Sequence, residues 1–74
     1  MDSNWITKQE KSQAKRIANQ VKVAQKWQDK GFPPEVIATG LWNKLAANTE
    51  VKNNQVTIWG LNFRTNELEI KATI

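Results

Sequence analysis

The spacing of apolar residues changes along the chain from a helical period to a strand period. From Thr7 to Gly31 apolar residues recur every three or four positions, which predicts an amphipathic helix over about residues 8–30. Thr7 and Glu10 form a capping-box pattern at its start, and Gly31 is typical of a helix C-terminus. The predicted apolar stripe consists of Ala14, Ile17, Ala18, Val21 and Ala24.

A second helix is predicted over about residues 35–47. Two prolines and Glu35 suit its first turn, because proline is preset for helix starts and a carboxylate complements the helix dipole. So few residues separate the two helices that they should form a tight helical hairpin. Gly40 lies off the apolar stripe of this helix, where it is either tolerated or needed for a close backbone approach. The stripe consists of Ile37, Ala38, Leu41, Trp42 and Leu45.

The C-terminal part alternates apolar and polar residues, as a β-hairpin does. A polar segment, residues 48–54, is interpreted as a loop, and strands are predicted over about 55–63 and 67–74. Pairing Phe63 with Leu68 aligns the apolar residues of both strands on one face, which we expect to cover the helices. The residues expected on that inner face are Trp59, Leu61, Phe63, Leu68, Ile70, Ala72 and Ile74.

These elements predict a single small α+β domain, residues 1–74, with two helices followed by a β-hairpin in the order ααββ. A lone hairpin is marginally stable and has two open edges. Val56 and Ile58 would place apolar groups on its outer face. We therefore expect a homodimer through the hairpin edge; the alternative is a monomer in which the loop covers Val56.

The amino-acid composition limits which covalent, metal-binding and catalytic chemistry the chain can support. The 74 residues include neither cysteine nor histidine, which excludes disulfides and the usual zinc sites. The two serines have no base near them in the sequence, and the three glycines form no phosphate-binding loop. We expect no enzyme activity, no metal and no cofactor. The chain starts without a basic and apolar leader and has no long apolar run, so a cytoplasmic protein that does not enter membranes is expected.

The net charge of +4 resides in the first 30 residues, where seven basic side chains outnumber three acids. Six lysines of the first helix fall within an arc of about 100° at 3.6 residues per turn. We call this arc the lysine face; Asn19 lies within it and Arg16 near its margin. The candidate anion-binding residues are Lys8, Lys11, Lys15, Arg16, Asn19, Lys22, Lys26 and Lys30.

A face of lysines rather than arginines suits contact with phosphates more than reading of base edges. The sequence therefore predicts a regulatory or accessory module that binds a polyanion, with the nucleic-acid backbone as the expected ligand. The alternative is a protein-interaction or inhibitor module whose basic helix docks on an acidic protein surface. The lysines could also form a plain solvated face. The four tryptophans are either stacking platforms for bases or anchors of the core.

Overall fold

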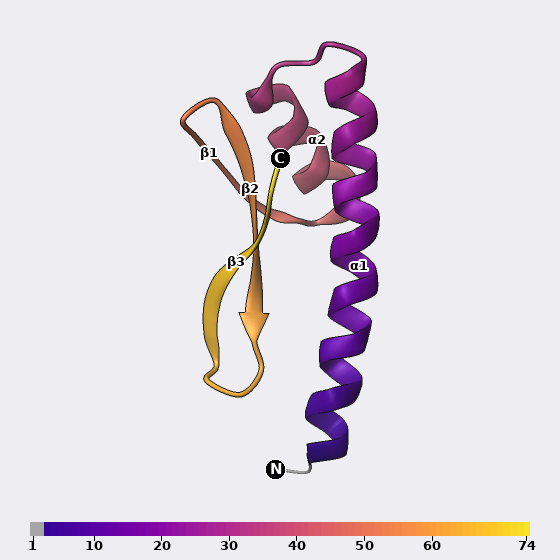
Figure 1. Ribbon diagram of the computed structural model, residues 1–74, viewed down its shortest axis with the longest axis vertical. Helices are drawn as coiled ribbons and strands as arrows, with labels where there is room; N and C mark the ends of the chain where they lie inside the picture. Colours follow the sequence, from indigo (N-terminus) through magenta and orange to yellow (C-terminus); the bar gives the residue numbers. More distant parts are fainter. Residues whose placement is uncertain (1–2) are drawn as a thin grey trace.

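The computed structural model describes residues 3–74; Met1 and Asp2 lie outside the described residues. Two helices, α1 (Ser3–Asp29) and α2 (Pro34–Leu45), precede an antiparallel sheet of three strands (Figure 1). The strands are β1 (Asn48–Lys52), β2 (Gln55–Asn62) and β3 (Glu67–Thr73), with β2 in the middle. The α+β class and the β2–β3 hairpin are confirmed. The predicted polar loop contains a further strand, β1, so the order is ααβββ.

The start of α1 differs from the prediction. The helix begins at Ser3, so the capping box at Thr7 is wrong: the Thr7 hydroxyl donates to the Ser3 carbonyl, 3.0 Å away, inside the helix. Glu10, the other member of the predicted box, pairs instead with Arg64 of the β2–β3 turn. A contact 54 residues away in the sequence thus replaces the local one that the pattern suggested.

The helix ends follow from backbone geometry. Gly31 adopts φ +88°, and the Gly31 and Phe32 amides donate to the Gln28 and Trp27 carbonyls at 2.9 and 3.2 Å. This Schellman arrangement confirms Gly31 as the end of α1. The second helix ends earlier than predicted, at Leu45, because Ala46 turns into the left-handed region.

Strand β1 was not predicted, because the sequence feature that indicates it is a turn formed by two adjacent asparagines within a polar segment. Asn53 and Asn54 have φ of 52° and 63°, which is the type I′ geometry of a two-residue hairpin. Before them, Thr49 and Val51 alternate with charged residues, and both are half-buried. The Thr49 hydroxyl donates to the Ala38 carbonyl of α2 at 3.2 Å, which ties β1 to that helix.

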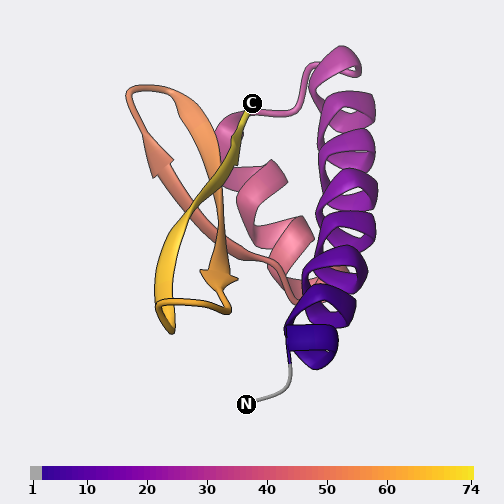
Figure 2. The same ribbon diagram turned by 60° about the horizontal axis from the view of Figure 1, so that its bottom comes forward.

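The elements form layers, with α2 between the sheet and the C-terminal half of α1 (Figures 1 and 2). The largest fully buried side chains come from α2 and from the central strand: Ile37, Leu41, Val56 and Ile58. The remaining buried apolar residues are small, namely Ala24, Ala38 and Ala47. One core therefore joins both helices to β2.

The predicted inner face of the hairpin is wrong at four positions, whereas Ala72 and Ile74 pack against the core as predicted. Val56 and Ile58, expected outside, are 1% and 0% exposed, whereas Leu68 and Ile70, expected inside, are 58% and 57% exposed. The register also differs, since Leu61 pairs with Leu68 and not with Ile70. Because β1 makes β2 the central strand, it is the inward side chains of β2 that α2 covers.

A β-bulge in β3 also contributes to the difference between the predicted and the observed inner face. Ile58 pairs with Ala72 and the next residue, Trp59, pairs with Ile70, which leaves Lys71 as an extra residue in β3. The extra residue lets Ala72 face the helices although Ile70 faces away. The alternation in β3 is therefore interrupted, which a strict period of two does not predict.

The apolar stripe of α1 is rotated relative to the prediction. Gln20 and Ala24 are its buried residues, whereas Ala14 and Ala18 are exposed. Trp27 packs on Gly40 of α2, where an added Cβ would lie 2.8 Å from Cζ3 of the indole. Gly40 therefore leaves room for the Trp27 side chain, and the group that approaches it is an indole ring and not a backbone.

The inverted sheet face can be tested by truncation. Ile58→Ala should lower the free energy of unfolding by about 2–5 kcal/mol, because it leaves a cavity in the core. Ile70→Ala should lower it by less than about 1 kcal/mol, because the side chain is largely exposed. Urea denaturation followed by circular dichroism measures both. Equal losses would contradict the observed orientation of β2 and β3.

The left-handed residue Ala46 offers a second test. Ala46→Gly should raise the free energy of unfolding by about 0.5–1 kcal/mol, since left-handed strain of about 1–2 kcal/mol exceeds the entropic cost of glycine. Gly31→Ala is the reverse control: an added Cβ there meets no atom within 4 Å, so only the backbone conformation changes. That variant should lose about 1 kcal/mol. A loss of stability in Ala46→Gly would contradict the helix end described above.

Candidate anion-binding face of α1

All residues predicted for the lysine face are exposed. This holds for Lys8, Lys11, Lys15, Arg16, Asn19, Lys22, Lys26 and Lys30. The buried residues of α1, Gln20 and Ala24, lie on the opposite side of the helix. At 1.5 Å per residue, the row from Lys8 to Lys26 extends over about 27 Å of the helix. It is a long and continuous positive surface that takes no part in the core.

The ion pairs of residues 3–74 leave this row untouched. Arg64 Nη2 lies 3.3 Å from Glu10 Oε1, and Lys71 Nζ lies 2.7 Å from Glu69 Oε1. Neither pair includes a lysine of α1. Because Glu10 is engaged with the β2–β3 turn, it does not offset the lysines. Their charge is therefore available to an external anion.

Two predicted residues differ from the others in their surroundings. Arg16 Nη1 donates to the Ser12 hydroxyl at 3.1 Å, and Arg16 also borders a hollow that reaches Gln20 and the sheet. Lys30 lies just beyond the end of α1, and its amide donates to the Lys26 carbonyl at 3.3 Å. The uninterrupted row on the helix itself is thus Lys8 to Lys26, with Asn19 between its lysines.

Two of the tryptophans, Trp5 and Trp27, make packing contacts within the fold. Trp5 meets Phe63 edge to face, with ring centroids 6.2 Å apart, and so connects the start of α1 to the end of β2. Trp27 packs on Gly40, and Lys44 Nζ lies 5.9 Å from its ring centroid. These contacts turn both indoles toward the rest of the fold. Trp5 nevertheless remains 46% exposed, whereas Trp27 is half-buried.

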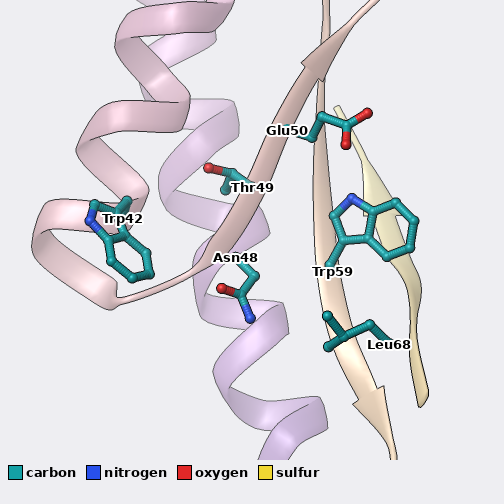
Figure 3. A pocket seen from close by; sticks show the side chains of 6 residues that line it. All are labelled: Trp42, Asn48, Thr49, Glu50, Trp59 and Leu68. Atoms are coloured by element: carbon teal, nitrogen blue, oxygen red, sulfur yellow. The ribbon is translucent and has the colours of Figure 1, made fainter.

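The other two tryptophans border a feature that the sequence did not predict. Trp42 of α2, 58% exposed, and Trp59 of β2 lie on either side of the edge strand β1 (Figure 3). Together with Asn48, Thr49, Glu50 and Leu68 they line an open hollow of about 530 Å³. The available signal was the Asn53–Asn54 turn, which implies a strand before it.

The remaining titratable chemistry is limited. Hydrogen bonds from Lys71 and then from Asn62 lower the pKa of Glu69, which keeps this carboxylate ionised beside its partners. Residues 3–74 contain no cluster of acidic side chains that could hold a metal ion. Neither helix in that range has both the length and the apolar character needed to cross a bilayer.

Comparison of the chain with protein families, curated proteins and solved structures finds no match. The function is therefore inferred from the residues and geometry of this chain.

The independence of the lysine face from the fold can be measured. Lys22→Gln/Lys26→Gln should leave the free energy of unfolding within about 0.5 kcal/mol of the parent, with a small gain at low salt. The gain is expected because like charges four residues apart on a helix repel each other. Thermal and urea unfolding at low and high salt test this. A loss above about 1 kcal/mol would show that these lysines have a structural role.

Proposed function

We propose that the protein is a non-enzymatic regulatory or accessory module that binds a polyanion, namely the phosphate backbone of nucleic acid, through the lysine face of α1. The observation that carries the proposal is the row of exposed lysines on α1, about 27 Å long, to which no ion pair within residues 3–74 contributes an acid. A purely solvated helix usually mixes charges of both signs to gain i,i+4 pairs.

The shape of the face supports backbone contact rather than base reading. The average spacing of the five lysines along the helix is about 6.8 Å, close to twice the 3.4 Å rise per nucleotide of one duplex strand. Ammonium groups on flexible stems can follow such a backbone as point charges. Arginine, which reads guanine edges, occurs only at the margin as Arg16. Binding of low sequence specificity follows.

The test is a fluorescence-anisotropy titration of random-sequence DNA and RNA, single- and double-stranded, between about 50 and about 200 mM salt. With four to six phosphate contacts, the logarithm of the affinity should fall against the logarithm of salt with a slope of about −4 to −5. Lys22→Gln/Lys26→Gln should weaken binding to all sequences by about tenfold or more and flatten the slope by about 2.

The matched control is Lys44→Gln, which removes one charge from an exposed site on α2 and is compared with Lys22→Gln alone. The affinity and the salt slope of this control should stay close to those of the parent protein. Equal weakening by both variants would indicate attraction by net charge alone and not by α1. An absence of binding at the lower salt concentration would contradict the nucleic-acid proposal and favour an acidic protein surface as the ligand.

A further inference from the structure

The two edges of the sheet differ in how they are protected. Edge strands expose unpaired backbone groups, and proteins block them with bulges and with charges that point inward. Strand β3 has both devices: the bulge at Lys71, and the Lys71–Glu69 ion pair, and Lys71 borders a hollow together with Gln13 and Ala14 of α1. Strand β1 pairs with β2 in a regular register over its whole length. It is the edge that remains open to another strand.

One hydrogen-bonded pair between the ends of β2 and β3 determines which backbone groups of β1 point out of the sheet. Val56 donates its N–H to the Ile74 carbonyl at 3.0 Å and accepts from the Ile74 N–H at 2.8 Å. Both polar groups of Val56 therefore point toward β3, and Val51, its partner in β1, belongs to a non-hydrogen-bonded pair. The N–H and C=O of Val51, and those of Thr49 two residues away, consequently point outward from the sheet edge.

We propose that β1 pairs antiparallel with β1 of a second copy of this chain, on a two-fold axis at Val51, to form a symmetric dimer with a continuous six-stranded sheet. At the axis the two copies of Val51 exchange both N–H···O=C bonds. This register places Glu50 directly opposite Lys52 of the partner and, by symmetry, Lys52 opposite the partner's Glu50. The proposal does not depend on the function proposed for α1.

Electrostatic interactions favour this register over the register in which the two-fold axis passes through Glu50. If the axis passed through Glu50, the two Glu50 side chains would meet in a non-hydrogen-bonded pair, where opposing Cα atoms are only about 4.5 Å apart. Like charges in that position are destabilising, whereas opposite charges across strands contribute favourably. Glu50 and Lys52 are both exposed, and neither forms an ion pair within residues 3–74. They are free to pair across an interface.

The surroundings of β1 suit an added strand. The hollow of about 530 Å³ beside it is bordered by two indoles, and the larger exposed apolar surface is that of Trp42 (Figure 3). In the proposed register the partner's Asn53 lies opposite Thr49, so the partner's turn comes beside Trp42. An incoming strand would thus shield an aromatic ring that the isolated chain leaves in water, in addition to satisfying the edge.

The test is a charge exchange followed by sedimentation equilibrium, from tens of micromolar to millimolar protein. The parent protein should dimerise. Glu50→Lys alone and Lys52→Glu alone should each weaken the dimer about tenfold or more, because each places like charges opposite each other twice. An equimolar mixture of the two single variants should associate as heterodimers with about the affinity of the parent, because every opposing pair is again of opposite sign. The double variant Glu50→Lys/Lys52→Glu should recover the parent affinity.

Glu67→Lys is the matched control, since it makes the same charge change at an exposed residue of the other edge. Its dimerisation should equal that of the parent, and circular dichroism should show all variants folded. A parent protein that stays monomeric at millimolar concentration would overturn the proposal. Single variants that dimerise as tightly as the parent, or a mixture that gives no recovery, would overturn it as well.

Discussion

The structure depends on covering the inner face of the central strand. Val56 and Ile58 of β2 lie against the α2 residues Ile37 and Leu41, and these four are the largest fully buried side chains. Burial of each contributes about 1.5–3 kcal/mol, which is large for a chain of 74 residues. Helix α2 is consequently the centre of the domain, and α1 and the outer strands are arranged around it.

The same constraint leaves half of α1 outside the core. Its N-terminal turns reach the end of the β2–β3 hairpin through the Trp5–Phe63 ring contact and the exposed Arg64–Glu10 pair. The ring contact contributes at most about 1.5 kcal/mol and the exposed ion pair at most about 1 kcal/mol, so they orient the hairpin more than they stabilise it. Because α1 needs only one narrow side for packing, the opposite side can carry lysines without weakening the core. The proposed anion-binding function uses that unused side.

The three-stranded sheet also sets which surfaces remain for association. A bulge and an internal ion pair occupy the β3 edge, while the β1 edge is regular and carries one acid and one base two residues apart. A strand with that pattern is complementary to itself when it runs antiparallel about the intervening residue. The lysine face and the β1 edge belong to separate elements, so the proposed anion binding and the proposed self-association can be tested separately.

The sequence by itself determined the two helices, the glycine that ends α1, the β2–β3 hairpin and the exposure of the lysine face, because these depend on local periodicity and backbone preference. The tertiary structure alone decided which side of the hairpin is buried. Leu68 and Ile70 alternate with polar residues, as Trp59 and Leu61 do, and the two strands can be paired so that all four lie on one face. The pattern therefore favours these four residues for the core. A third strand and a bulge reverse that choice, since covering Val56 and Ile58 requires contacts among β1, β2 and α2 that no single segment encodes. The N-terminal part of α1 is a second example. Its Glu10 pairs with Arg64, which is distant in the sequence, and does not form a local cap.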